Sequence, residues 1–243
     1  MTLVIAHRGN SSVAPENTLP ALAAAGFAGA DLIEIDVQIG RDGAGVVIHD
    51  DSVDRTTDAS GPVNVLDTAE VARLDAGAWK DLSYSGAVVP MFAQVLELLG
   101  RFQDLGLLLE FKGTWPEGPA SDLLAALTAS AVADRTIVQS FDIDTVRVLR
   151  DLAPTVRCAG LARSGDAETI AICTDLGLMA CNPHHRSVIE DPASVQRMHE
   201  AGLKTFPWTA NEPADWAALV AAGVDGIITD RPDRLLGWLS AQA

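Results

Sequence analysis

The chain has 243 residues, of which 48% are hydrophobic and 21% are charged, a composition typical of a well-packed globular protein. Lys and Arg number 17 against 33 Asp and Glu, and the formal net charge of -16 would repel a nucleic-acid backbone or an anionic membrane surface. These numbers exclude a disordered or fibrous chain, argue against nucleic acid as a partner, and fit a single domain over residues 1–243.

Short apolar segments typical of buried strands alternate with helical stretches along most of the chain. This order predicts a parallel sheet, because parallel strands are usually joined by helices. The candidate strands cover residues 3–7, 32–37, 45–49, 107–111, 136–140, 156–161, 178–182, 204–208 and 226–229. The candidate helices include residues 17–28, 120–132, 142–151, 166–175, 191–201 and 213–222.

The third strand segment follows the second without a helix between them. The intervening residues 40–43 contain the Asp-Gly dipeptide of tight hairpins, so strand 45–49 should fold back on strand 32–37 and place His49 roughly opposite Asp36. Eight parallel strands remain once this antiparallel arm is set aside. We therefore predict a TIM (β/α)8 barrel, for which the chain has an ordinary length.

Residues 50–100 are too long for a single connection between a strand and a helix. They combine a turn-rich part with helical pieces at 67–74 and 91–100. We predict a small insertion that follows the hairpin and walls the carboxyl ends of the barrel strands, where barrel enzymes carry their active sites. The alternative is a surface excursion that makes no functional contact.

Three carboxylates occur inside or at the end of strand segments. Glu34 and Asp36 are two residues apart in the second strand and therefore share a face, and Glu110 follows the apolar residues 107–109. Buried neighbouring anions are costly unless a cation lies between them. An all-oxygen set predicts one divalent metal ion, Mg²⁺ or Ca²⁺ with Mn²⁺ also possible, rather than zinc or copper.

Cations and histidines accompany these carboxylates at the strand ends. Arg8 and Lys112 would leave the metal-loaded site locally positive, and their geometry suits a bound phosphate group. His7 and His49 come from different strands and suit general acid and general base roles. Gln139, at the end of another strand, is a candidate polar contact for a substrate.

The sequence resembles the glycerophosphodiester phosphodiesterases over nearly its whole length. The matching motifs occur in that family's order, and as a series they are far more specific than any one triplet. They are residues 6–9 (AHRG), 14–18 (APENT), 34–37 (EIDV), 49–50 (HD), 55–57 (RTT), 74–77 (LDAG), 110–112 (EFK), 139–142 (QSFD), 207–209 (PWT) and 226–232 (GIITDRP).

The resemblance implies a barrel with one inserted segment, and a phosphoric diester hydrolase that cleaves glycerophosphodiesters to glycerol 3-phosphate and an alcohol in lipid and glycerol metabolism. By position it implies the same roles: His7 and His49 as acid and base, a metal bound by the three carboxylates, and phosphate contacts from Arg8 and Lys112. The nucleophile is either the substrate's glycerol 2-hydroxyl or water. Trp208 would stack on the glycerol or the leaving group, or else pack in the core.

Several other polar residues have simpler interpretations. Glu16 and Asn17 are expected to start the first helix, with Asn17 as its N-cap, although either could reach the site. Cys158, Cys173 and Cys181 lack metal-ligand spacing and are expected to be reduced thiols in the core. No secretory signal or membrane span is visible, so we expect a cytoplasmic protein with a small-molecule substrate and no obligate protein partner.

Two alternative functions use the same residues. A lysophospholipase D would cleave a lysophospholipid at the same metal site, and it would need an apolar channel formed by Trp79, Tyr84, Met91 and Phe92. A noncatalytic barrel would bind a phosphorylated metabolite without turnover. The presence of two histidines beside three carboxylates argues against this second alternative, because binding alone requires no acid and base pair.

Overall fold

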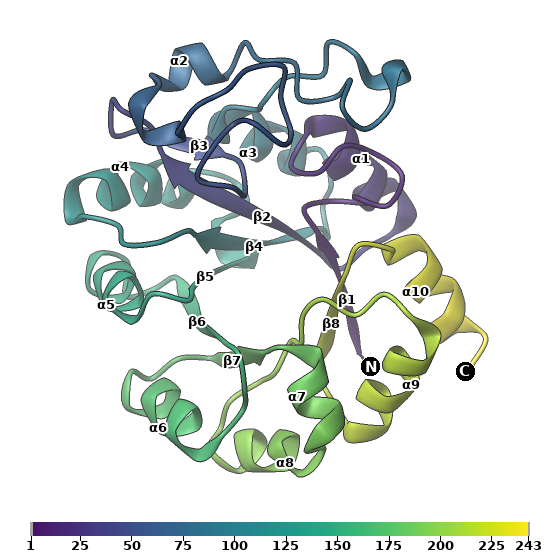
Figure 1. The fold of residues 1–243 in the computed structure, drawn as a ribbon. Helices are drawn as coiled ribbons and strands as arrows, with labels where there is room; N and C mark the ends of the chain where they lie inside the picture. Colours follow the sequence, from purple (N-terminus) through teal and green to yellow (C-terminus); the bar gives the residue numbers. More distant parts are fainter. Residues whose placement is uncertain (1, 243) are drawn as a thin grey trace.

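A curled sheet of seven parallel strands and one antiparallel strand forms the centre of the molecule, and helices surround it (Figure 1). The structure, a computed structural model, describes residues 2–242. The sheet order is β7-β6-β5-β4-β2-β1-β8, with β3 beside β2. The parallel strands are β1 (Leu3–His7), β2 (Leu32–Ile39), β4 (Gly106–Phe111), β5 (Thr136–Ser140), β6 (Arg157–Ala162), β7 (Ala180–Pro183) and β8 (Gly226–Thr229). The predicted parallel α/β barrel architecture is therefore confirmed.

Residues 204–208 fill the space between β7 and β8 without forming a regular strand. The amide of Lys204 donates to the carbonyl of Met179 at 2.9 Å, and the amide of Ile228 donates to the carbonyl of Pro207 at 3.0 Å. Only isolated bridges join this segment to β7. The predicted strand is wrong in this detail, because the amides of Thr205 and Phe206 donate to the side chains of Asp225 and Asn182, and Pro207 has no N–H to donate.

The helices form an outer layer that covers the sheet (Figure 1). Most of them lie within a few residues of their predicted positions, while α7 and α10 follow short loops that the periodicity did not resolve. They are α1 (Leu19–Ala28), α3 (Phe92–Gly100), α4 (Glu117–Thr128), η3 (Ala133–Arg135), α5 (Ile143–Leu152), α6 (Ala167–Asp175), α7 (His185–Glu190), α8 (Ala193–Glu200), α9 (Pro213–Ala222) and α10 (Pro232–Ser240).

Strand alternation divides the apolar residues between two layers. In β2, Ile33, Ile35 and Val37 pack with the helices, whereas Leu32 belongs to a separate cluster inside the barrel. Side chains two apart share a face, so the interior side of β2 continues from Leu32 to its two carboxylates. The interior cluster consists of Ile5, Leu32, Leu108, Ile137, Ala159, Ala180, Phe206 and Ile228. The strands thereby direct the polar residues beyond this cluster into the mouth of the barrel.

The predicted hairpin is present. β3 (Gly45–Val47) runs antiparallel to β2, and Val37 pairs with Val47. This register places Ile48 opposite Asp36, so His49 lies one residue beyond the expected position and outside the ladder. The side chain of Gln38 fixes this end of the arm by donating from Nε2 to the carbonyl of His49 at 2.9 Å.

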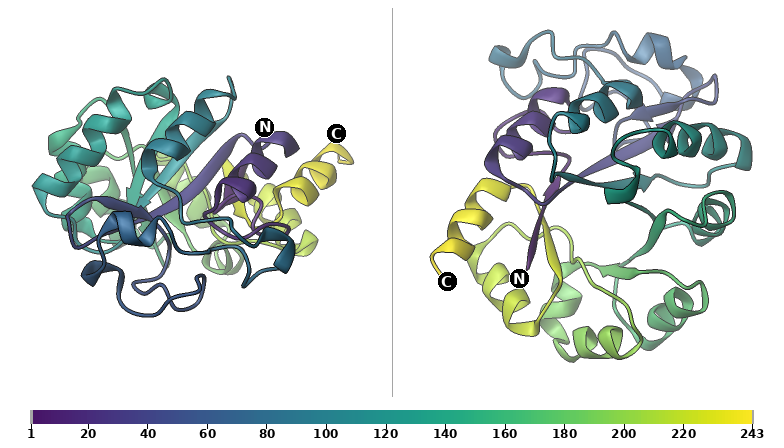
Figure 2. Two further views of the ribbon diagram at one scale, coloured as in Figure 1. Left: turned by 90° about the horizontal axis from the view of Figure 1, so that it is seen from above. Right: turned by 180° about the vertical axis from the view of Figure 1, so that it is seen from behind.

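The segment between β3 and α3 has a small apolar core of its own and lies beside β2, β3 and α1 (Figure 2). It contains η1 (Val63–Val65), α2 (Thr68–Val71) and η2 (Leu82–Tyr84). Two hydrogen bonds tie it to the loop between β1 and α1: Lys80 Nζ to the carbonyl of Ser11 at 2.8 Å, and the Tyr84 hydroxyl to the carbonyl of Val13 at 2.8 Å. We call residues 48–91 the excursion, because α3 itself packs in the barrel's helical layer.

Two further sequence predictions concern the whole chain. Cys158, Cys173 and Cys181 are free and buried, as expected. Within residues 2–242, every helix is too short or too polar to cross a membrane.

Candidate active site

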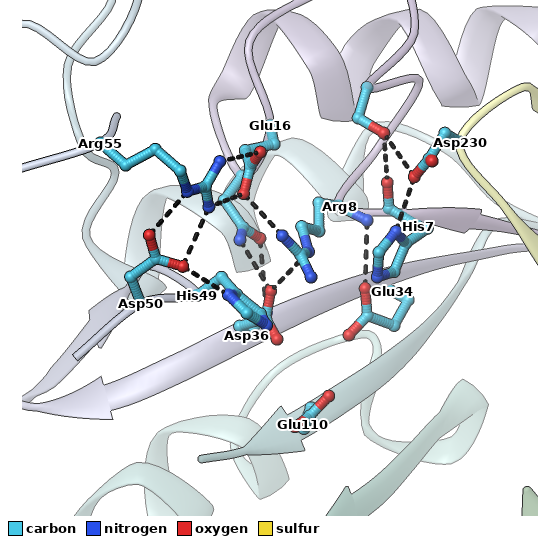
Figure 3. A network of polar contacts seen from close by, with 12 residues as sticks. His7, Arg8, Glu16, Glu34, Asp36, His49, Asp50, Arg55, Glu110 and Asp230 are labelled. Atoms are coloured by element: carbon cyan, nitrogen blue, oxygen red, sulfur yellow. Dashed lines mark hydrogen bonds and ion pairs between the residues drawn. The ribbon is translucent and has the colours of Figure 1, made fainter. Parts of the chain in front are cut away.

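Glu34, Asp36 and Glu110 meet at the carboxyl ends of β2 and β4, where Asp36 is the register partner of Glu110. Their exposed fractions are 1%, 1% and 7%, and one oxygen atom from each lies within 4.8 Å of the others. Figure 3 shows the three carboxylates and the polar network around them. The juxtaposition expected from the two-residue spacing is therefore present in the fold.

Burial and mutual repulsion act against ionisation of two of these groups. The pKa of Glu34 is well above its usual value because of burial and the nearby carboxylates of Asp36 and Glu110. Burial and the charge of Asp36 raise the pKa of Glu110 to about 7. The positive charge of the nearby side chains is therefore too small to keep all three carboxyl groups ionised.

Asp36 is the carboxylate with the strongest local support. Burial alone would raise its pKa, but the charges of Arg8, His49 and Lys112 outweigh burial and lower it. Asn17 donates from Nδ2 to Asp36 Oδ2 at 2.9 Å and accepts from the Asp36 amide at 3.3 Å. The predicted N-cap role of Asn17 is wrong: it adopts a left-handed φ of 57° and positions Asp36, while Thr18 precedes α1.

These residues fit a hard divalent cation. The Oδ1 atom of Asp36 is buried without a hydrogen-bond partner, and the nearest cation recorded for it is Lys112 Nζ at 3.6 Å. Lys112 instead contacts Glu110 Oε1 at 2.8 Å. Three converging carboxylates with an unsatisfied buried oxygen are the donor set that Mg²⁺, Ca²⁺ or Mn²⁺ prefers.

Arg8 connects the triad to the loop that follows β1. Its backbone has a φ of 56°, and its amide donates to Glu34 Oε2 at 3.1 Å. The guanidinium contacts Glu16 Oε1 at 2.7 Å and Asp36 Oδ2 at 3.2 Å. Burial would lower the pKa of Arg8, but the charges of Asp36, Glu16 and Glu34 outweigh burial and raise it. Arg8 is therefore a fixed cation beside the acidic cluster.

His7 at the end of β1 is oriented by a carboxylate at the end of β8. Its Nδ1 lies 2.6 Å from Asp230 Oδ1. Asp230 also accepts from Ser11 Oγ at 3.1 Å and from Asn211 Nδ2 at 2.6 Å. Burial opposes ionisation of Asp230, but the hydrogen bonds from His7, Asn211 and Ser11 and the charge of His7 together outweigh burial and lower the pKa of Asp230. An ionised partner at Nδ1 leaves Nε2 as the nitrogen free for proton transfer.

His49 has the same arrangement with its own neighbour in sequence. Its Nδ1 lies 2.6 Å from Asp50 Oδ1, and Arg55 Nε donates to Asp50 Oδ2 at 2.6 Å. Arg55 also donates to both oxygens of Glu16, each at 2.8 Å. Burial lowers the pKa of His49, which favours the neutral imidazole. Arg55 thus links the carboxylate that holds His49 to the carboxylate that holds Arg8 (Figure 3).

Nearly all the predicted site residues line one cleft, which has a volume of ≈340 Å³ when the space open to solvent is included. Asp36 is the exception, because it lies beneath the cleft. Gln139 accepts from Asn182 Nδ2 at 2.9 Å, and Trp208 Nε1 donates to the Asn182 carbonyl at 2.9 Å. The cleft is lined by His7, Arg8, Glu34, His49, Glu110, Lys112, Gln139, Phe141, Leu161, Trp208 and Ile228.

Sequence reasoning missed the carboxylates and the arginine that hold the two histidines. Asp50 directly follows His49, so its role could have been suspected from the dipeptide. Asp230 stands at the carboxyl end of the last strand, a position typical of barrel site residues. Glu16 and Arg55 lie in two of the matching motifs, and Glu16 was considered as a site residue, but the ion pair that joins them depends on the paths of two loops in the whole fold.

Comparisons with known proteins agree with this arrangement. The family model "Glycerophosphoryl diester phosphodiesterase family" matches residues 7–234. A glycerophosphodiester phosphodiesterase of Caldanaerobacter subterraneus is 37% identical over 238 residues, covering 97% of this chain and 96% of that protein.

Two solved structures extend the likeness to the fold. A glycerophosphodiester phosphodiesterase of Agrobacterium tumefaciens has a TM-score of 0.84 and 29% identity, covering 98% of this chain and all of that one. An Oleispira antarctica phosphodiesterase in complex with its product sn-glycerol-3-phosphate has a TM-score of 0.90 and 28% identity, covering 99% and 97% of the two chains.

The raised pKa of Glu110 predicts a pH-dependent effect of metal on stability. A carboxyl group whose pKa is higher in the folded than in the unfolded protein contributes stability below the unfolded pKa, and this contribution is lost as pH rises through about 7. A divalent cation should offset the loss. We expect the increase in melting temperature on adding Mg²⁺, Ca²⁺ or Mn²⁺ to grow from about pH 5 to about pH 8.

Glu110→Gln should remove most of the pH-dependent increase in the metal-induced shift of the melting temperature. Glu97→Gln, an exposed substitution on α3, should leave this increase unchanged. A metal-induced shift that is the same at all these pH values in the unsubstituted protein would contradict the expectation.

Proposed function

The chain belongs to the glycerophosphoryl diester phosphodiesterase family and is a glycerophosphodiester phosphodiesterase, and from this premise we propose that it hydrolyses glycerophosphodiesters to glycerol 3-phosphate and an alcohol in a metal-dependent reaction. The observation that carries the proposal is the cleft in which Glu34 and Glu110, with Asp36 buried beside them, meet two aspartate-held histidines. Residues 1–243 would act as one catalytic domain.

The phosphate group would bind between the acidic triad and the two cations of the cleft. A divalent ion held by Glu34, Asp36 and Glu110 would supply positive charge to a nonbridging phosphate oxygen. Arg8 and Lys112 would donate hydrogen bonds to the same group, and both are already oriented by carboxylates. Trp208 would offer an aromatic face to the glycerol carbons, with Gln139 as a polar contact.

The two histidines would divide the proton transfers. His49 has a lowered pKa and would be largely neutral near pH 7, so it would take the proton of the attacking hydroxyl, whether that belongs to the glycerol or to water. His7 would then protonate the oxygen of the departing alcohol. Asp230 and Asp50 would keep each ring oriented and would stabilise its protonated form.

The placement of four aromatic and sulfur-containing residues favours polar diesters over lysophospholipids. Phe92 is buried in the core, and the Tyr84 hydroxyl is bonded to the carbonyl of Val13. Trp79 lines a groove whose other described residues are polar, and the backbone of Met91 forms an isolated antiparallel bridge with that of Val46. An acyl channel would require these four side chains to face one cavity, so the lysophospholipase alternative receives no support from their positions.

The proposal predicts release of glycerol 3-phosphate from glycerophosphocholine. We expect turnover that disappears with a chelator and returns when Mg²⁺, Ca²⁺ or Mn²⁺ is restored. His7→Asn and His49→Asn should each lower kcat by roughly 10²-fold or more, because each removes a proton-transfer group. The measurement is a coupled assay of glycerol 3-phosphate, together with titration of the metal into each variant.

The matched control is His199→Asn, since His199 is exposed on α8 and pairs with Asp225 away from the cleft. Metal affinity should be nearly unchanged in all the histidine variants, because the three proposed metal ligands are carboxylates. Full activity of the His7 and His49 variants would overturn the assigned chemistry, and turnover that survives complete metal removal would overturn the metal dependence. Binding of the diester without any turnover would instead support the noncatalytic alternative.

Arg55 generates a second prediction, because it holds the carboxylate partners of both His49 and Arg8. Arg55→Gln should reduce kcat/KM by roughly tenfold, as is usual for residues that orient groups of a metal site. Arg41→Gln is the matched control: Arg41 lies in the turn between β2 and β3, pairs with Asp67 of the excursion and is 56% exposed. Equal kcat/KM values for the two variants would show that Arg55 does not position the site.

A further inference from the structure

A second groove begins where the cleft ends. It shares His7 and Arg8 with the cleft and extends outward between the loop after β1, the excursion and the end of β8. Its space is ≈770 Å³, including the part open to solvent. Trp79 is the only apolar side chain among the residues that line it, which also include Ser11, Lys80, Asn211 and Arg231. The groove is therefore a polar channel that leads away from His7.

One charged side chain that lines the groove has no oppositely charged partner. Arg8 is paired with Glu16, Asp230 with His7, and Arg231 with Glu212 at 3.1 Å. The Lys80 ammonium donates to the carbonyl of Ser11 at 2.8 Å, but among residues 2–242 no carboxylate lies within ion-pair distance of it.

In a chain with a formal net charge of -16, this unpaired cation gives the groove a local attraction for anions that most of the surface lacks. An ammonium that keeps two of its three donors free beside a polar groove is suited to an anionic ligand.

The groove also has a defined place in the reaction. The attacking oxygen and the leaving oxygen lie on opposite sides of the phosphorus, and the proposed roles put His49 on the first side and His7 on the second. The glycerol arm would occupy the cleft beside Trp208 and Phe141. The alcohol that leaves past His7 would then extend into the groove.

We propose that this groove is the subsite for the alcohol moiety of the substrate, and that Lys80 selects alcohols that carry a carboxylate or a second phosphate. This inference rests on the proposed diesterase function and deepens it by naming a substrate class. The excursion has a specific task in this account, because it brings Lys80 to the loop after β1 and closes one side of the groove.

The test compares two substrates that differ by one carboxylate. Glycerophosphoserine and glycerophosphoethanolamine share the glycerophosphate and the amino group, so the ratio of their kcat/KM values isolates the effect of the anion. We expect the unsubstituted enzyme to prefer the serine diester, and Lys80→Gln to reduce this preference by about twofold to fivefold, the range of an exposed ion pair. Lys80→Arg should retain most of the preference.

Lys204→Gln is the matched control, because it removes the same charge at the opposite end of the barrel strands. The ratio of its kcat/KM values for the serine and ethanolamine diesters should equal that of the unsubstituted enzyme. A purely structural role of Lys80 would lower both kcat/KM values and leave their ratio intact, which would overturn the inference.

A preference for ethanolamine over serine would also overturn it, and would point instead to the Trp79 ring as a cation site. If the unsubstituted enzyme cleaved neither diester in the presence of metal, the proposed function itself would fail, so the two failures are distinguishable.

Discussion

Three carboxylates that repel one another are held within 4.8 Å inside the mouth of a barrel, where little water can reach them. Strand geometry enforces this contact: Glu34 and Asp36 share the interior face of β2, and Glu110 is paired in register on β4. The free energy of the arrangement improves with added positive charge, from bound protons, from fixed cations or from a metal. The other polar features of the site can be understood as responses to that requirement.

The fixed cations are themselves held in place by a surrounding ring of carboxylates. Glu16 orients Arg8, and Arg55 connects Glu16 to the aspartate that orients His49. All of these residues belong to the excursion or to the loop after β1, and direct hydrogen bonds join those segments at Ser11 and Val13. The excursion therefore contributes to the site by positioning residues, and its wall also defines the groove beyond His7.

Much of this site could be predicted from local sequence, because alternation along a strand fixes which side chains share a face. The acidic triad and the lysine beside Glu110 follow from that rule, and the Asp-Gly turn predicts the hairpin that returns His49. The partner of His7 could not be found in this way, since Asp230 is 223 residues away and meets it only when the barrel closes. Asn17 was assigned to a helix cap from residue preference alone, whereas tertiary contact with Asp36 determined its conformation. The segment 204–208 has a strand-like composition, but Pro207 interrupts its hydrogen bonding.

The most direct test of the central claim is a crystal structure of the protein soaked with Mn²⁺, measured with anomalous scattering. The account predicts one strong peak per chain, with one oxygen of each of Glu34, Asp36 and Glu110 at about 2.0–2.6 Å from it. A saturating soak that leaves the space between those carboxylates without a peak, or that places the ion on other residues, would contradict the account.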